Sequence, residues 1–496
     1  MADVSISSKI DFEKLFFPRA IGIIGASLNP TGGGFFARVL KGRFRGPIYL
    51  FNPRLKGQEL FGMKVHGSIL EISESEPIDY VVLAVKAQLC PKLLEEIGIK
   101  GVPFVTIFAS GFSEVGKGNL EQEVIDIAKK YKIRIIGPNC LGVYNPAGGL
   151  YINAVQSKKA GNFSAVFQSG GLSVNVSNLA VSYGCFVSKL VSVGNAIDLT
   201  YPDFMEYFLY DDKTAIIGLY LENLKSQKDG RRFFESAKKL NLNRKPVILW
   251  RVGFGEATKK AIMSHTGGLA GNNRIWEAVA KQTGCCLVNN STQLAALASG
   301  FKNIKLPRTR NLGVIGIGGG SCIELSDTLE KYNLKIPQLD EKTIKKLSRF
   351  LPDVNTNVTN PIDLGGQGIL PNVYYRVILA LDKDPNIDAI VFVKDPERFS
   401  GFSEQVIKEY GFGGMDLNQI FLKYMRKAKK ITTKPIVCVM LKISEGFEEY
   451  KSRYRFKLSL LNRFIPVYES IDLAGMVLDH MNTYREFLQK NNVYPK

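Results

Sequence analysis

Hydrophobic positions along the chain form short runs rich in β-branched residues, which alternate with longer stretches of helical periodicity. This alternation is typical of parallel α/β units, in which a buried strand is followed by a helix that covers the sheet. The runs that predict strands fall into three series. They are 20–24, 48–51, 80–85, 104–108 and 134–136; then 165–167, 189–193, 215–221, 246–250 and 286–288; then 312–317, 389–393, 435–440 and 465–468.

Two stretches interrupt this periodicity and predict domain boundaries. Residues 145–149 (N-P-A-G-G) and residues 303–310 replace the apolar pattern by Pro, Gly and basic residues. We therefore expect an α/β protein of three doubly wound domains, near 1–147, 148–305 and 306–496. The length of 496 residues agrees with this number, since a domain has about 150 residues.

The overall composition is that of an ordinary folded protein, with 45% hydrophobic and 22% charged residues. No apolar run approaches the roughly 20 residues that cross a bilayer, so we expect no membrane partner and a cytoplasmic location. The 7 cysteines are an odd number without a C-x-x-C pair. This pattern predicts neither a disulfide framework nor a zinc site.

The net charge of +19 raises the question of an anionic partner. The densest basic cluster, 423–430 (K-Y-M-R-K-A-K-K), has helical spacing and fits a solvated helix face. No aromatic stripe, zinc finger or basic arm accompanies it, so nucleic acid is not an expected partner. The charge better suits soluble polyphosphate ligands or an acidic partner protein.

Each predicted domain begins with a strand, a glycine-rich turn and a helix. The turns are 21–27 (I-G-I-I-G-A-S), 167–172 (F-Q-S-G-G-L) and 316–321 (G-I-G-G-G-S). Glycine lets the backbone approach a ligand, and the N–H groups of a helix start attract anions. Tight turns also use glycine for packing alone, so a single turn leaves both interpretations open.

The first domain lacks the acidic residue that binds a ribose in dinucleotide-binding folds. Its second strand ends in Asn52, and the glycine spacing is not G-x-G-x-x-G. Arg54, Lys56 and Lys86 instead supply positive charge after predicted strands. They suit a nucleotide rich in phosphate, such as coenzyme A, although Arg54 and Lys56 also fit solvated loop positions.

Only one of the 3 histidines has a neighbourhood suited to chemistry. His66 lies in a predicted turn before a helix, and His480 lies in a C-terminal amphipathic helix. His265 lies in the glycine-rich loop 264–273 that ends at a helix N-cap, where a reagent could reach it. Glu222, at the end of a predicted strand, is a candidate partner that would hold its tautomer.

Motifs distributed over the whole chain match one family. They are 24–27 (I-G-A-S), 52–53 (N-P), 110–112 (S-G-F) with Glu114, 137–142 (G-P-N-C-L-G), 168–171 (Q-S-G-G), 192–195 (S-V-G-N), 221–222 (L-E), 264–271 (S-H-T-G-G-L-A-G) and 360–364 (N-P-I-D-L). On these motifs the chain resembles the α subunit of the ADP-forming acyl-CoA synthetases, the ADP-forming acetate–CoA ligase group. That group is related to succinyl-CoA synthetase.

The resemblance implies roles for individual residues. His265 would be transiently phosphorylated, and Glu222 would stabilise the phosphohistidine. Phosphate would bind at a helix start formed by Ser169, Gly170 and Gly171, with Asn139 near the acyl and phosphate groups. The residues implied in binding coenzyme A are Gly25, Ala26, Ser27, Pro53, Lys86, Ser110 and Gly111.

The resemblance also implies a fold and a reaction. The fold comprises a CoA-binding Rossmann-like domain, a flavodoxin-like domain with the phosphohistidine loop and a flavodoxin-like ligase domain. The reaction interconverts acyl-CoA, ADP and phosphate with carboxylic acid, ATP and CoA, through acyl phosphate and phosphohistidine. Only a helical tail follows Pro466, so the ATP-grasp part, with ADP or ATP and Mg²⁺, is expected on a separate β subunit in an α2β2 heterotetramer.

Two other functions compete with this interpretation. One is a regulatory protein of the same fold that binds coenzyme A or a nucleotide without catalysis. The other is a nicotinamide-dependent dehydrogenase, which Asn52 at the ribose position disfavours. Phosphorylation of His265 would separate the catalytic from the purely binding alternative.

Overall fold

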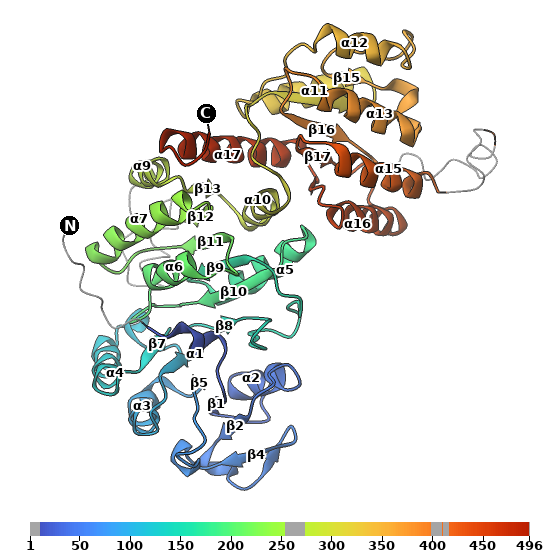
Figure 1. Cartoon of the computed structure of the whole chain (residues 1–496). Helices are drawn as coiled ribbons and strands as arrows, with labels where there is room; N and C mark the ends of the chain where they lie inside the picture. The colour runs from blue at the N-terminus through green and yellow to red at the C-terminus, as the bar shows by residue number, and fades with distance from the viewer. Residues whose placement is uncertain (1–9, 253–272, 398–408, 410–415, 496) are drawn as a thin grey trace. The chain divides into compact units, whose positions relative to one another are not determined.

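The computed structural model describes residues 10–252, 273–397, 409 and 416–495 (Figure 1). The described chain contains three mainly parallel sheets. It divides into two compact units, one within residues 1–179 and 186–294 and the other within residues 180–185 and 295–496. The first unit holds the first two sheets, and the second unit holds the third.

The first sheet has the strand order β3-β4-β2-β1-β5-β6-β7, in which only the β3–β4 pair is antiparallel. β1 lies at its centre and pairs with β2 on one side and with β5 on the other. Its elements are α1 (Phe12–Phe16), β1 (Ile21–Ile24), α2 (Gly33–Leu40), β2 (Ile48–Phe51), η1 (Pro53–Leu55), β3 (Glu59–Leu60), β4 (Met63–His66), η2 (Ile69–Glu71), β5 (Tyr80–Leu83), η3 (Ala87–Leu89), α3 (Cys90–Ile99), β6 (Phe104–Ile107), η4 (Ser113–Val115), α4 (Gly118–Tyr131) and β7 (Arg134–Ile136).

The second sheet has the order β13-β12-β11-β9-β10-β8, in which only the β10–β8 pair is antiparallel. β8 begins at Gly142, ahead of the expected boundary at 147, and the three-domain division stays a prediction. The elements are β8 (Gly142–Tyr144), β9 (Phe163–Phe167), α5 (Gly170–Ser182), β10 (Val187–Ser192), α6 (Tyr201–Tyr210), β11 (Ile216–Leu221), α7 (Gln227–Leu242), β12 (Val247–Arg251), α9 (Asn273–Thr283), β13 (Cys286–Val288) and α10 (Ser291–Asn303).

The third sheet is wholly parallel, with the order β15-β14-β16-β17-β18. The glycine-rich turn 316–321 joins β14 to α11, as the sequence predicts. The elements are β14 (Leu312–Gly316), α11 (Gly319–Glu330), α12 (Glu341–Ser348), β15 (Ile362–Asp363), η5 (Gly365–Ile369), α13 (Pro371–Asp382), β16 (Ala389–Val393), α15 (Leu417–Ile431), β17 (Ile436–Val439), α16 (Phe447–Leu461), β18 (Val467–Tyr468) and α17 (Ile471–Lys490).

The first two sheets share one hydrophobic core. A single cluster of buried side chains includes Ile23 and Val82 of the first sheet and Val166 and Leu219 of the second. Because parallel strands are buried on both faces, their sequences are continuous apolar runs rather than alternating ones. The other face of the first sheet packs under α3 and α4 in a second cluster that includes Leu83.

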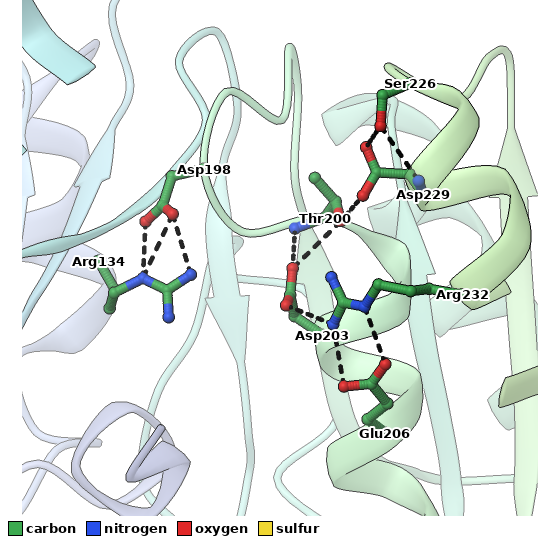
Figure 2. Close-up of polar contacts among 8 residues, drawn as sticks. All are labelled: Arg134, Asp198, Thr200, Asp203, Glu206, Ser226, Asp229 and Arg232. Carbon is green, nitrogen blue, oxygen red and sulfur yellow. Dashed lines mark hydrogen bonds and ion pairs between the residues drawn. The ribbon is translucent and has the colours of Figure 1, made fainter. Parts of the chain in front are cut away.

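Charged side chains strengthen the same unit at its surface (Figure 2). Arg134 of β7 lies 2.9 Å from Asp198, in the segment that leads to α6, and so connects the two sheets. Arg232 of α7 contacts Asp203 and Glu206 of α6 at 2.9 Å each. The first contact holds the segment between β10 and α6 against β7, and the contacts of Arg232 hold α6 against α7.

The predicted strands all occur, whereas four short strands were not expected. These are β3, β4, β8 and β15. The expected turn at His66 is wrong, because 63–66 forms β4, and the expected helix after it is the single turn η2. Val65 of β4 is buried and pairs with Leu50, but a run this short has no clear periodicity. His480 lies in helix α17, as predicted.

No helix in the described part of the chain is long and apolar enough to cross a membrane.

Candidate active site

A cavity of about 740 Å³ lies at the carboxyl ends of β5, β6 and β7 and at the start of α5. In doubly wound folds, ligands bind at this edge of the sheet. Five residues singled out from the sequence line the cavity. They are Lys86, Ser110, Asn139, Gly170 and Gly171. The remaining lining residues are Thr31, Gly32, Ala84, Val85, Phe108, Ala109, Cys140 and Leu141.

The turn after β1 packs tightly against one wall of this cavity. Gly25 has φ +92°, and a Cβ there would lie 2.3 Å from the backbone oxygen of Ala84. Only glycine fits this position without strain. Gly25, Ala26 and Ser27 are not among the residues that line the cavity.

Asn52 explains why the second strand ends in N-P. Its side-chain amide donates to the backbone oxygen of Ala26 over 2.8 Å, and its side-chain oxygen accepts from the N–H of Arg54. Pro53 then begins η1. Asn52 thus occupies the position at which a dinucleotide-binding fold has an acidic residue, and here its side chain connects the end of β2 to the turn after β1. Pro53 and Arg54 are not among the residues that line the cavity.

Lys86 brings a positive charge to the cavity. It is exposed, it is the N-cap residue of η3, and no carboxylate of the described residues forms an ion pair with it. Lys56, the other basic residue considered with it, is bound instead by Glu71 at 2.7 Å. Of these two lysines, Lys86 is therefore the one available to a phosphate group in the cavity.

Asn139 adopts a backbone conformation that few residues tolerate. Its φ is +58°, in the left-handed region where asparagine is favoured over other residues with a side chain. Its N–H donates to the backbone oxygen of Ala109 over 2.9 Å. This contact connects the loop after β7 to the loop after β6, which carries Ser110.

The start of α5 lies on the cavity wall. The hydroxyl oxygen of Ser169 accepts from the N–H of Leu172 over 3.3 Å, as an N-cap side chain does. Gly170 and Gly171 follow on the cavity wall. The first N–H groups of a helix have no intrahelical partner and attract an anion such as phosphate. Ser169 itself is not part of the lining.

Glu222 lies at the carboxyl end of β11, as the sequence predicts. The Tyr220 hydroxyl bonds to its side chain, and burial together with the charge of Glu222 raises the pKa of that tyrosine. The side-chain oxygen of Gln168 accepts from the N–H groups of Glu222 at 3.1 Å and Asn223 at 3.4 Å. Gln168 thus connects Glu222 to the start of α5.

His265 lies outside the described residues, together with Gly267, Gly268 and Gly271. Its pairing with Glu222 therefore stays a prediction. Glu222 does not line the cavity, but it is joined to the cavity wall through Gln168 and Ser169.

Motifs in the sequence did not identify every residue that lines the cavity. Thr31, Phe108 and Leu141 line it, and no motif marked Thr31 or Phe108. Gln168 and Leu141 lay within matched motifs, which was the only signal for them. Among the described residues, no group of three or more His, Cys, Asp or Glu side chains could hold a metal ion.

Two protein-family models match this chain. A CoA binding domain matches residues 19–146, and a succinyl-CoA ligase like flavodoxin domain matches residues 160–301. The first match covers every strand of the first sheet and also β8, and the second match covers the other strands of the second sheet.

Named relatives are ligases. The chain is 34% identical to the α subunit of the ADP-forming acetate–CoA ligase II of Pyrococcus furiosus, over 84% of this chain and 92% of that protein. It is 37% identical to the ADP-forming acetate–CoA ligase of Methanocaldococcus jannaschii, over 72% of this chain and 49% of that protein. The matched region thus spans about half the length of the second relative.

A solved structure has the same architecture. It is the dinucleotide forming acetyl-coenzyme A synthetase 1 of Ca. Korarchaeum cryptofilum in complex with phosphate and ADP. The TM-score is 0.82 at 27% sequence identity, and the match covers 97% of this chain and 99% of that chain.

Proposed function

Because this chain belongs to the family of ADP-forming acetate–CoA ligases and their α subunits, we propose that it catalyses acyl transfer between coenzyme A and phosphate. The full reaction converts acyl-CoA, ADP and phosphate to carboxylic acid, ATP and CoA, and it is reversible. The observation that carries this proposal is the cavity that Lys86, Ser110 and Asn139 line together with the start of α5.

In the first step, phosphate at the start of α5 attacks the thioester carbonyl of acyl-CoA. The carbon–oxygen bond of an acyl phosphate forms, the carbon–sulfur bond breaks, and CoA leaves with the electron pair as a thiolate that takes up a proton. The N–H groups of Gly170 and Gly171 face the phosphate and stabilise its negative charge. Lys86 binds the phosphates of coenzyme A, and Asn139 contacts the acyl group.

In the second step, neutral His265 attacks the phosphorus atom of the acyl phosphate, and the carboxylate leaves. The carboxylate of Glu222 accepts a hydrogen bond from the other imidazole nitrogen and stabilises the positive charge of the phosphohistidine. Gln168 supports this role, because it connects Glu222 to the start of α5 where phosphate binds. The phosphoryl group then passes to ADP.

The ADP site belongs to a partner in this proposal. Relatives named as α subunits support a second subunit, which would carry an ATP-grasp fold with Mg²⁺ and ADP or ATP in an α2β2 assembly. A purely binding role is not favoured, since the relatives are named as ligases. A dehydrogenase is not favoured either, because Asn52 binds Ala26 where the ribose acid would stand.

The test is phosphorylation of His265. With a β subunit and ATP, or with acetyl-CoA and phosphate, we expect a phosphoprotein that is labile in acid and stable in base. H265A should abolish the label, whereas H66Q, at a histidine of strand β4 that does not line the cavity, should keep it. A label that persists in H265A would contradict the assignment.

A further inference from the structure

Glu114 does not line the cavity, yet its carboxylate contacts two loops around it. One oxygen accepts from the N–H groups of Gly111 at 2.5 Å and Phe112 at 3.2 Å. The other oxygen accepts from the side-chain amide of Asn195 at 2.6 Å. Gly111 follows β6 of the first sheet, and Asn195 follows β10 of the second sheet. The carboxylate therefore joins two segments that lie 81 positions apart in the sequence.

These contacts close a ring of hydrogen bonds with the loop that carries Asn139. The N–H of Asn195 donates to the backbone oxygen of Pro138 over 2.9 Å. The N–H of Asn139 donates to Ala109 over 2.9 Å, and Ala109 leads through Ser110 to Gly111. The ring thus passes through the backbone of Ser110 and Asn139, two polar residues that line the cavity.

The ring has little room to shift. A Cβ on Gly194 would lie 2.2 Å from the backbone oxygen of Pro138, so the loop after β10 packs directly on the Pro138 backbone. Asn195 is 2% exposed. Gly111, by contrast, has φ +112° and no side chain to fix it. The carboxylate of Glu114 is the side-chain group that binds its N–H.

The carboxylate is held in its charged form. Burial opposes ionisation of Glu114, but hydrogen bonds from the Gly111, Asn195 and Phe112 donors outweigh it, so the pKa of the carboxyl lies below its ordinary value. Hydrogen bonds to a charged acceptor are shorter and stronger than those between neutral groups. Glu114 is therefore suited to fix a glycine turn that would otherwise adopt several conformations.

We propose that Glu114 is a positioning residue for acyl transfer, which holds the Ser110 turn and the Asn139 loop in the geometry that binds coenzyme A. The inference rests on the proposed function. It predicts that a change at Glu114 acts on ligand binding through Gly111 and Asn195, without Glu114 touching the ligand. A small displacement of groups that position a substrate is enough to lower binding and rate strongly.

The test exchanges donor and acceptor across the Glu114–Asn195 contact. E114A removes the acceptor, and N195D places two carboxylates against each other. In E114Q/N195D the glutamine oxygen still accepts from Gly111, while its amide donates to the carboxylate introduced at position 195. Binding of CoA to each purified chain is measured by calorimetry. We expect E114A and N195D to bind CoA at least about tenfold more weakly, and the double variant to recover to within about threefold of the wild type.

The control variant is D198N, which removes the charge of another contact between the same two sheets (Figure 2). It should lower the melting temperature and leave CoA affinity unchanged. If D198N weakens CoA binding as much as E114A does, Glu114 has a structural role only. Wild-type affinity in E114A and N195D, or a double variant no better than N195D, would overturn the inference. A wild-type chain that does not bind CoA would instead refute the proposed function.

Discussion

Gln168 and Glu222 are joined by a hydrogen bond of 3.1 Å, from the backbone N–H of Glu222 to the side-chain oxygen of Gln168. Gln168 directly precedes Ser169 and the start of α5, whereas Glu222 directly follows β11. The amide of Gln168 also donates to Asn223 over 3.3 Å. One buried side chain therefore fixes the predicted phosphate site against the predicted partner of His265.

Removal of the Gln168 side chain should lower the yield of the phosphorylated enzyme. In Q168A the N–H of Glu222 loses its acceptor, so we expect the yield of phosphohistidine to fall about tenfold or more. The matched control is Q156A, because Gln156 is also a buried glutamine whose side-chain oxygen accepts from two backbone N–H groups, those of Ile152 and Asn153. Q156A should lose a similar amount of stability in urea and keep the yield. Equal losses of yield in both variants would contradict a local role for Gln168.

Gly170 and Gly171 should respond differently to alanine. A Cβ on Gly170 would lie 2.8 Å from Cγ of Leu141, whereas a Cβ on Gly171 would meet no atom within 4 Å. We expect G170A to lower the free energy of unfolding by about 1–3 kcal/mol through overpacking. G171A should stay within about 1 kcal/mol of the wild type but bind phosphate more weakly, because its methyl group occupies space that the ligand would approach. Urea unfolding and phosphate titration measure the two effects, and unaltered phosphate affinity in G171A would contradict the site.

Lys86 should contribute long-range attraction for coenzyme A. Exposed charges act through solvent and are screened by salt, so K86A should weaken CoA binding most at low ionic strength. K56A is the control, because Lys56 is already bound by Glu71 and does not line the cavity. CoA affinity is measured at several salt concentrations. The affinity of K86A should depend less on salt than that of the wild type, whereas K56A should behave like the wild type. If the CoA affinity of K86A depends on salt concentration as strongly as that of the wild type, Lys86 does not contact the phosphates of CoA.

Asp211 should make stability depend on pH below neutrality. Its carboxylate lies 2.7 Å from the ammonium group of Lys189, and both side chains are buried. Burial opposes its ionisation, but hydrogen bonds from Lys189 and Thr214 outweigh this and keep the pKa of Asp211 below its ordinary value. The unfolded chain therefore takes up this proton at higher pH than the folded chain does. The stabilisation is complete above the unfolded pKa of about 4 and is lost as the pH falls through the folded pKa.

D211N should remove this stabilisation at neutral pH. It leaves the charge of Lys189 buried without its carboxylate, which costs about 3–5 kcal/mol. Urea unfolding at pH 7 and at pH 3 measures the free energy of unfolding of the wild type and of D211N. The difference between the two proteins should be smaller at pH 3. If the free energies of unfolding of the wild type and D211N differ by the same amount at both pH values, Asp211 has the same pKa in the folded and the unfolded chain, which would contradict the prediction.

Much of the fold could be predicted because its strands are buried on both faces. All residues of β1, β5 and β6 are buried, so each appears as a continuous apolar run. The short strands β4 and β8 lack this signal, since a few residues carry no periodicity. The partners in the ring of Glu114 and Asn195 could not be predicted at all, because the sequence does not specify which distant loops meet.

The sequence by itself determined the chemistry of each loop and the family. Glycine turns, Asn139, Lys86 and the S-H-T-G-G-L-A-G motif are local properties that residue type and spacing carry. The carboxyl ends of parallel strands meet at one edge of a sheet, so even the general location of Ser110 and Asn139 follows from order along the chain. Only the tertiary structure decided which loops touch. The contacts of Gln168 with Glu222 and of Glu114 with Asn195 depend on how the two sheets pack, and that packing results from many buried side chains acting together.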